Sequence, residues 1–415
     1  MFWVASSASE TRFERKRQAI VDAATMLINR NGVKGLTFVE VAEIVGIGAS
    51  SIAYYFRRKE LLAAACYTGT LDRIEAIVTA ALHRATVQAR VGAYLDGYIA
   101  LHAAIRAGDA PPLAILSDMR ALDEEVRAPL MEHYSRIFAQ VRAFFGVVET
   151  EHDRVSHGAR ALILTEAIYW FPVTLDAYFV EDFARVRTTM IDIFLHGLTP
   201  ANGLWRSGQV SLGEDAPGGT GGGQDFLRVA TRLIGERGYR GASVEKIAAE
   251  LNVTKGSFYH HNAAKDDVVL ACFRRSYAVM AAAQRQADAL SGNWLDRLAV
   301  TIESLLRVQM AGEWPLLRTT ALQTLPPDVR EEVLDLSRRV ARHFSGMISD
   351  GIVDGSIRPV DPEIAGNIIM SSINAATELR LRDRSGAGLD EAVALYAAAL
   401  AYGLLPSGAA VPAAI

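Results

Sequence analysis

Apolar residues recur at spacings of three and four along most of this chain, which is the period of an amphipathic α-helix. A first such helix ends near Gly32 and its counterpart near Gly238, because glycine readily adopts the left-handed conformation that closes a helix. Long segments rich in Ala, Leu and Arg, with few consecutive β-branched residues, continue the pattern. We therefore expect an all-α fold. The apolar faces of the two helices consist of Ile20, Ala23, Ala24 and Leu27, and of Leu227, Ala230 and Leu233.

A short second helix follows each of these helices, and a third begins a few residues later. Thr37 and Ser243 precede the short helices and can cap them, because a hydroxyl oxygen accepts a hydrogen bond from an N–H group of the first turn. Gly46 and Asn252 stand where the chain must turn, and both residue types tolerate a positive φ. Two short helices joined by a tight turn are typical of a DNA-binding helix-turn-helix.

The two helix-turn-helix patterns belong to one long internal repeat with an offset of 206 residues. At this offset TMLINRNGVKG (25–35) lies over TRLIGERGYRG (231–241), and near the other end Gly197 lies over Gly403. The copied unit is therefore nearly the whole half-chain. Between the copies the glycine-rich stretch DAPGGTGGG lacks apolar periodicity, which predicts a flexible linker.

Composition narrows the class of protein. A chain of 415 residues is long enough for two domains, each with its own core. Its formal net charge is −4, so a nucleic-acid surface must be local. Two cysteines, Cys66 and Cys272, cannot form a disulfide framework, and no run reaches the roughly 18 uncharged apolar residues of a membrane span. We expect a cytoplasmic protein without a membrane partner.

The recognition helix of a helix-turn-helix enters the major groove. Its exposed face therefore needs small or hydroxylated residues that let the backbone approach the bases, together with side chains that donate hydrogen bonds to them. Polar side chains just beyond it can donate to phosphates and fix the register. In the first copy the predicted DNA-binding residues are Thr37, Gly48, Ala49, Ser50, Ser51, Tyr54, Tyr55 and Lys59. In the second copy they are Ser243, Thr254, Lys255, Gly256, Ser257, Tyr259, His260 and Lys265.

These segments resemble the TetR family of one-component transcriptional regulators. The second copy, VTKGSFYHHNAAKDD, is very similar to the family pattern, and the first, IGASSIAYYFRRKELL, is similar more loosely. The stretch GIVDGSIRPVDPEIAGNIIMSSINA (351–375) resembles the ligand and dimer domain common in the family. The resemblance implies that the remaining helices form a ligand pocket. It also implies that the last two helices pack against a partner in a four-helix bundle.

Each copy departs from the family pattern. In the first, Gly48 stands where a capping Ser or Thr is usual. In the second, Asn262 stands where the first copy has Phe56, which removes an apolar anchor. Nine basic and five acidic residues give residues 12–63 a net charge of +4, whereas seven and six give residues 224–268 a net charge of +1. The higher positive charge therefore favours DNA binding by the first copy. The closer similarity to the TetR family pattern favours DNA binding by the second copy.

The sequence gives less support to a metal site, a redox switch or an enzyme. Adjacent His260 and His261 point to different sides of a helix and have no suitably spaced ligand partner, so we expect no metal. Cys66 and Cys272 lie among alanines and are typical of core residues rather than of a redox switch. No phosphate-binding loop or catalytic motif occurs, which predicts that the chain is not an enzyme and binds no cofactor besides an unknown small-molecule effector. Aromatic residues that can line an effector pocket, or equally belong to the helical core, are Phe138, Tyr169, Trp170, Phe171, Trp314 and Phe344.

The sequence thus predicts two tandem units, each an N-terminal three-helix DNA-binding domain followed by a helical ligand and dimerisation bundle. We expect a ligand-responsive repressor that binds double-stranded operator DNA as an intramolecular pseudo-dimer, with helices at 155–198 packed on those at 361–405. Two alternatives stay open, a tandem protein that homodimerises and a sensor whose degenerate heads no longer bind DNA. The predicted domains are helix-turn-helix domains at 12–63 and 224–269, regulatory domains at 64–199 and 270–405, and a linker at 200–223.

Overall fold

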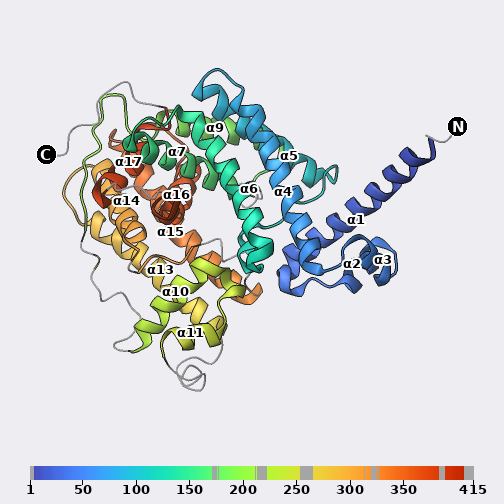
Figure 1. Ribbon diagram of the computed structural model, residues 1–415. Coiled ribbons are helices and arrows are strands. Elements are labelled where there is room, and N and C mark those ends of the chain that lie inside the picture. Colours follow the sequence, from blue (N-terminus) through green and yellow to red (C-terminus); the bar gives the residue numbers. More distant parts are fainter. Residues whose placement is uncertain are drawn as a thin grey trace.

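The computed structural model describes residues 4–170, 175, 177–210, 212, 222–252, 265–312, 314–318, 325, 327–382 and 388–405, and within these ranges it contains helices and turns but no strand. This confirms the predicted all-α fold (Figure 1). The first half contains α1 (Val4–Gly35), α2 (Phe38–Val45), α3 (Ala49–Tyr55), α4 (Lys59–Leu82), α5 (Val87–Ala107), η1 (Leu116–Ala121), α6 (Glu124–Arg142), η2 (Ala143–Phe145), α7 (Glu151–Tyr169), η3 (Val180–Asp182) and α9 (Phe183–His196). The second half contains α10 (Gly222–Gly241), α11 (Val244–Glu250), α13 (Lys265–Asp288), α14 (Trp294–Ala311), α15 (Pro327–Val353), α16 (Pro362–Arg382) and α17 (Leu389–Tyr402).

The first helix-turn-helix domain forms where α1, α2 and α3 pack together with α4. Thr37 caps α2, and its side-chain oxygen accepts a hydrogen bond from the N–H of Glu40 over 3.3 Å. Gly46 ends α2 in the left-handed conformation, with φ at 70°. Helical geometry in α1 is interrupted at Gly32, also at φ 70°. The predicted cap, turn and first-helix end are therefore confirmed.

The second helix-turn-helix domain repeats these features. Ser243 caps α11 by accepting a hydrogen bond from the N–H of Lys246, and α10 is interrupted at Gly238 with φ at 71°. Asn252 follows α11 with φ at 55°, the one non-glycine residue with a positive φ in the described part of the chain. These predictions are confirmed as well. Residues 253–264, which contain the predicted second recognition helix, lie outside the described residues.

The two cysteines occupy equivalent places in the two halves. The thiol of Cys66 lies 3.4 Å from the carbonyl oxygen of Val21, and the thiol of Cys272 lies 3.6 Å from that of Leu227. Both pairs are related by the offset of 206 residues. Burial raises the pKa of each thiol to about 11, so both remain protonated at neutral pH. Both cysteines are buried core residues, as predicted.

The amino-terminal part of the predicted linker lies on the second half. The indole N–H of Trp205 donates to the buried carboxylate of Glu303 on α14 over 2.9 Å, and the N–H of Gly208 donates to the same carboxylate over 3.2 Å. The N–H of Val210 donates to the hydroxyl of Ser304 over 2.9 Å. Hydrogen bonds therefore attach this part of the connection to α14.

The two halves meet along a seam in which α7 and α9 pack against α16 and α17 (Figure 1). Gly197 and Gly403 end the equivalent helices α9 and α17, with φ at 63° and 90°. A Cβ on Gly197 would lie 2.3 Å from the carbonyl oxygen of Ala401, and a Cβ on Gly403 would lie 2.4 Å from that of Leu195. Because each backbone passes so close to the other, only glycine fits at both positions.

Further hydrogen bonds cross the seam. The N–H of Leu198 donates to the carbonyl of Ala401 over 3.0 Å. Arg358 of the second half donates to the carbonyl of Gly197 over 2.7 Å and forms an ion pair with Asp192 over 2.7 Å. These bonds hold the carboxyl-terminal end of α9 against the second half.

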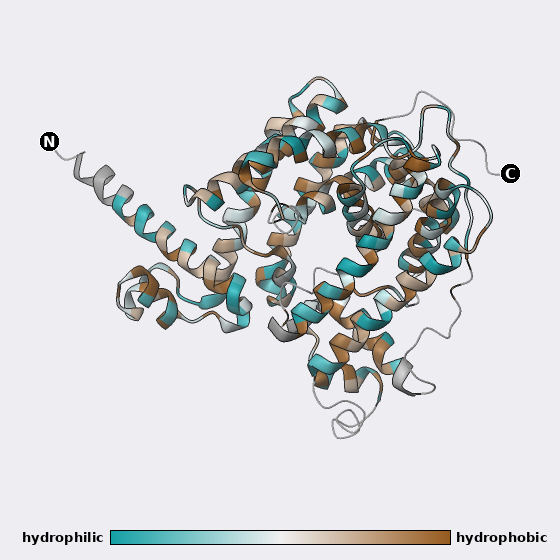
Figure 2. Ribbon diagram, turned by 180° about the vertical axis from the view of Figure 1, so that it is seen from behind, coloured by the Kyte–Doolittle hydropathy of each residue, from teal (hydrophilic) through white to brown (hydrophobic). Residues whose placement is uncertain are grey.

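A single hydrophobic cluster of buried residues extends through both halves. Figure 2 shows apolar residues toward the interior and hydrophilic residues on the outer faces of the helices. Among the described helices, none is alone long and apolar enough to cross a membrane. α2 and α3 reach that composition only when taken together, and the chain bends by 102° between them.

Candidate DNA-binding interface and ligand cavities

The third helix of the first domain has one buried face and one exposed face. Ile52 and Phe56 point into the core, whereas Ser50, Ser51 and Tyr54 are exposed. Gly48 forms the amino-terminal cap of α3 without a side-chain hydrogen bond, as its lack of a side chain requires. The outer face thus carries the small and hydroxylated residues that close approach to a base edge needs.

An aromatic cluster packs α3 against α1. The rings of Phe13 and Tyr55 stack with centroids 4.7 Å apart, and Tyr54 packs edge-on against both. The guanidinium of Arg17 lies over the ring of Phe56 at 5.1 Å. Tyr55 is consequently half-buried, while Tyr54 is 77% exposed and open to a phosphate. Sequence reasoning missed Phe13 and Arg17, because both precede the apolar face that defined the first helix.

Basic side chains flank the exposed face of α3. Arg57, Arg58 and Lys59 are exposed, and none of them has an ion pair within the described part of the chain. In the second domain, Arg232 is paired with Glu236 and with Glu250, at 3.4 and 2.5 Å. Exposed, unpaired cations bind phosphates more readily than paired ones, because no internal partner must be released first.

Only two of the predicted DNA-binding residues of the second domain can be placed. Ser243 caps α11, and Lys265 begins α13 as a half-buried residue. The other six lie outside the described residues: Thr254, Lys255, Gly256, Ser257, Tyr259 and His260.

The first regulatory domain contains a cavity of about 310 Å³. Two residues from the predicted effector set, Phe138 and Tyr169, line it. Burial raises the pKa of Tyr94, Tyr98 and Tyr169, so their phenols stay neutral and act as hydrogen-bonding groups. The wall is mainly apolar with a few polar groups, which is the usual character of a small-molecule site. Its aromatic residues are Tyr94, Tyr98, His102, Tyr134, Phe138 and Tyr169.

We call residues 111–121 the bridging segment, and its residues 112–116 form one wall of this cavity. The amide of Asn29 on α1 donates to the carbonyl of Leu113 over 2.8 Å and accepts from the N–H of Ile115 over 2.9 Å. At the other end, Arg120 donates to the carbonyl of Gly235 on α10, and η1 packs against both α1 and α10. The bridging segment therefore contacts the first helix of both helix-turn-helix domains.

A buried ion cluster joins the bridging segment to the seam. Arg120 pairs with Glu378 over 2.7 Å, and Arg318 pairs with the same carboxylate. Glu166 on α7 lies 3.9 Å from Arg318 and accepts from the indole N–H of Trp170 over 3.2 Å. Burial raises the pKa of Glu166, although the charge of Arg318 opposes this shift. Each half contributes one arginine and one glutamate to the cluster, so it ties the halves together.

The remaining predicted effector residues lie elsewhere. Trp170 lines a second, larger cavity beside the seam, and Phe171 lies outside the described residues. Trp314 stacks beneath the guanidinium of Arg275 at 3.7 Å, and Phe344 is fully buried in the core. Neither Trp314 nor Phe344 lines one of these two cavities. Their role as effector contacts stays a prediction.

One group of side chains has the composition of a metal site. Potential ligand atoms of Asp72, Glu75 and His133 lie within 4.8 Å of one another. A hydrogen bond of 2.8 Å joins His133 to Glu75, and Gln140 donates to the same carboxylate over 3.2 Å. These bonds between α4 and α6 account for the position of His133 beside Glu75.

Comparison with known proteins identifies the family. The family model for "Bacterial regulatory proteins, tetR family" matches residues 20–66 and 226–272, which are 206 residues apart. A second family model, "Tetracyclin repressor-like, C-terminal domain", matches residues 291–378. The chain therefore belongs to the TetR family of transcriptional regulators and carries the family's DNA-binding domain twice. Because the matched families are regulators, the prediction that the chain is not an enzyme is confirmed.

Individual relatives are similar to less than half of this chain. The Fatty acid metabolism regulator protein of Bacillus subtilis (strain 168) is 22% identical over 152 residues, which are 36% of this chain and 78% of the relative. The HTH-type transcriptional repressor DhaR of Mycobacterium sp. (strain GP1) is 27% identical over 177 residues, 40% of this chain and 86% of the relative. The crystal structure of the TetR family transcriptional regulator PfmR from Thermus thermophilus covers 44% of this chain and 99% of its own, with 23% identity and a TM-score of 0.37.

Proposed function

We propose that the protein is a ligand-responsive repressor in which one chain presents both recognition helices to an operator with two unlike half-sites. The observation that carries this proposal is the seam of α7 and α9 with α16 and α17, in which the equivalent glycines Gly197 and Gly403 meet. Two equivalent helix pairs that face each other correspond to the isologous interface of a dimeric regulator. The connection within one chain gives the two halves a high effective concentration, so the pair acts as an intramolecular pseudo-dimer.

The mass of the complex on DNA tests this architecture. Light scattering of the full chain with a duplex selected from a randomised pool reports mass and binding together. We expect one chain on one duplex. Two chains per duplex would instead favour a tandem protein that homodimerises. A failure to select any duplex would overturn the repressor and favour a sensor with degenerate heads.

The 310 Å³ cavity of the first regulatory domain is the effector site in this proposal. Its wall suits a mainly apolar molecule with a polar group near Tyr98 or His102. The bridging segment supports its role, because this segment lines the cavity and bonds to Asn29 on one side and through Arg120 to Gly235 on the other. A ligand that displaces the bridging segment would shift both helix-turn-helix domains toward a state that releases DNA.

A substitution that fills the cavity tests this coupling without a known effector. Ile105 lines the cavity, whereas Ala100 on the same helix is exposed. We expect Ile105→Trp to mimic the ligand and weaken operator binding about tenfold, a shift of about 1.4 kcal/mol. Ala100→Trp is the matched control and should leave affinity unchanged. Equal affinities for the two folded variants, checked by circular dichroism, would contradict this site as the effector site.

A further inference from the structure

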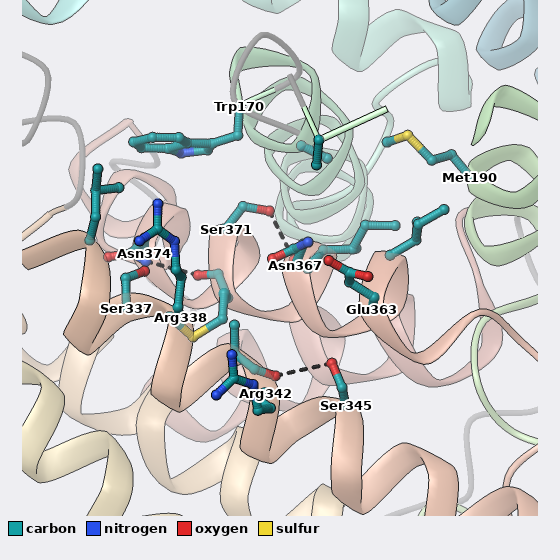
Figure 3. Close-up of a pocket in the computed structure, with 17 residues that line it drawn as sticks. Trp170, Met190, Ser337, Arg338, Arg342, Ser345, Glu363, Asn367, Ser371 and Asn374 are labelled. Atoms are coloured by element: carbon teal, nitrogen blue, oxygen red, sulfur yellow. Dashed lines mark hydrogen bonds between the residues drawn. The ribbon is translucent and has the colours of Figure 1, made fainter. Parts of the chain in front are cut away.

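A second cavity, of about 820 Å³, lies between the two halves and is separate from the effector cavity. α15 and α16 of the second half form most of its wall, and α7 and α9 of the first half close it through Trp170 and Met190 (Figure 3). The end of α7 separates the two cavities, because Tyr169 lines the first and Trp170, the next residue, lines the second. The cavity is therefore assembled only when the two halves are packed together.

Two arginines face this cavity without an internal partner. Arg338 and Arg342 are one helical turn apart on α15 and both line the cavity (Figure 3). Both side chains are exposed, and neither has a hydrogen bond or ion pair to any residue in the described ranges. Arg339, between them on another face of α15, is instead paired with Asp335 over 2.9 Å. The two guanidinium groups are thus donors without a protein partner that border the same space.

The other side chains show what kind of group would use those donors. The hydroxyls of Ser345 and Ser371 donate to carbonyls of their own helices, and the amide of Asn374 also donates to a carbonyl on its own helix (Figure 3). These groups offer acceptors to the cavity, whereas the arginines offer the free charged donors. Glu363 is the single acidic residue among the described residues of the wall, so the cavity retains a positive charge.

The opposite part of the wall is apolar. Met190, Ile364 and Ile368 are buried and line the cavity together with the half-buried ring of Trp170. The hydrogen bond from Trp170 to Glu166 fixes the orientation of the indole. A ligand that covers both regions needs a charged end for the arginines and an apolar body for this surface.

We propose that this cavity binds an amphipathic anion, with its carboxylate or phosphate held by Arg338 and Arg342 and its apolar body on Trp170, Met190 and Ile368. Guanidinium groups hold such oxyanions through paired, charge-assisted hydrogen bonds, which explains two arginines at this spacing. The site goes beyond the regulator proposed above and does not depend on DNA binding. Because both halves supply the wall, the bound anion stabilises the seam.

Calorimetry on the full-length protein, without DNA, tests the site. The probes are decanoate and decyl phosphate, with decanol as the neutral analogue of equal chain length. We expect at least one of the two anions to bind and decanol to bind about tenfold more weakly or not at all. The anion that binds more tightly distinguishes a carboxylate ligand from a phosphate ligand. Equal binding of decanol, or no binding of either anion, would overturn the proposal.

Substitutions in and near the cavity test whether the anionic probe binds there. The double change Arg338→Gln and Arg342→Gln should weaken anion binding about tenfold or more, whereas Arg339→Gln, which alters the same helix outside the cavity, should leave it unchanged. Bound anion should also change the tryptophan fluorescence, and Trp170→Phe should remove that change. An equal loss in Arg339→Gln, or a loss caused by Ile105→Trp in the other cavity but not by the double change, would place the probe elsewhere and overturn the assignment.

Discussion

The two regulatory domains share a framework but differ in their interiors. Thr70 and Ser276, which are equivalent by the repeat, each accept a hydrogen bond of 2.8 Å from a backbone N–H, that of Ala114 and that of Leu317. In the first domain the neighbouring space is an open cavity. In the second domain the fully buried Gln309 donates to the carbonyl of Asn374 and accepts from the N–H of Leu316.

The repeated residues therefore fall into two groups, those that hold the backbone and those that face the interior of each domain. Groups that bond to the backbone recur in both halves, because the same helices must be held in the same way. Side chains that face the interior differ, and in the second domain Gln309 bonds to the backbone at both ends of its amide. The interior of the first domain is therefore suited to take up a ligand, whereas a buried, hydrogen-bonded side chain occupies the interior of the second.

The largest expected loss of stability comes from substitutions at the seam, which both halves form. Gly197→Ala and Gly403→Ala should each lower the free energy of unfolding by on the order of 3 kcal/mol or more, because the new Cβ meets a backbone carbonyl. Gly355→Ala is a matched control, since its φ is 79° and no atom lies within 4 Å of the added Cβ. It should lose only about 1 to 2 kcal/mol for the left-handed conformation. Chemical denaturation measures all three, and equal losses would show that the close approach is relaxed in solution.

The next prediction is a difference of about 1 to 2 kcal/mol between the two interiors. Phe344, fully buried in the second domain, is equivalent by the repeat to Phe138, which is 8% exposed and lines the first cavity. We expect Phe344→Ala to cost about 3 to 5 kcal/mol in unfolding free energy, and Phe138→Ala about 1 to 2 kcal/mol less, since Phe138 already borders empty space. Denaturant unfolding gives both values. A larger loss for Phe138→Ala would mean that the first interior is the better packed one.

A smaller effect concerns the two helix-turn-helix domains. Lys59 is exposed, whereas Lys265 is half-buried and is followed by Asp266 and Asp267. Lys59→Ala should reduce the salt dependence of operator binding by about one unit of slope, and Lys265→Ala should reduce it by less. Arg136→Ala on the regulatory helix α6 serves as the control. Operator affinity over a range of salt concentrations is the measurement, and the reverse order would assign the stronger phosphate contact to the second domain.

The smallest difference between the halves is expected at the thiols. Burial raises the pKa of Cys66 and of Cys272 to about 11, so the folded protein should react with iodoacetamide far more slowly at pH 8 than the unfolded chain does. The rates should rise only as the pH approaches 11. The same shifts lower stability as pH rises from 9 toward 11, because the unfolded thiols ionise first. Rapid labelling of one thiol in the folded protein would show that the two cores differ there.

The sequence was sufficient for features that depend on local chemistry. Thr37, Ser243, Gly46 and Asn252 were predicted to cap or turn the chain because these residue types satisfy a helix end or tolerate a positive φ. The repeat then located their counterparts without knowledge of the packing. The seam helices also fall largely within the ranges expected from the repeat and the family resemblance.

Features that depend on contacts between residues far apart in the sequence could not be predicted from local residue types. The bridging segment has little helical periodicity, and its partners Asn29 and Gly235 lie 84 residues before and 115 residues after the groups that they contact. Tyr169 and Trp170 were both predicted as residues that can line an effector pocket. Neighbours on a helix point about 100° apart, however, and these two line different cavities.

The covalent link across the seam changes how the protein responds to dilution and to mutation. Two separate chains fall apart as their concentration falls, whereas Gly197 and Gly403 stay on one polypeptide at any dilution. A mutation in a homodimer alters both faces of the interface at once and must suit both. In this chain a mutation alters one face alone, so the two halves are free to acquire different ligands and different half-sites while their shared boundary stays intact.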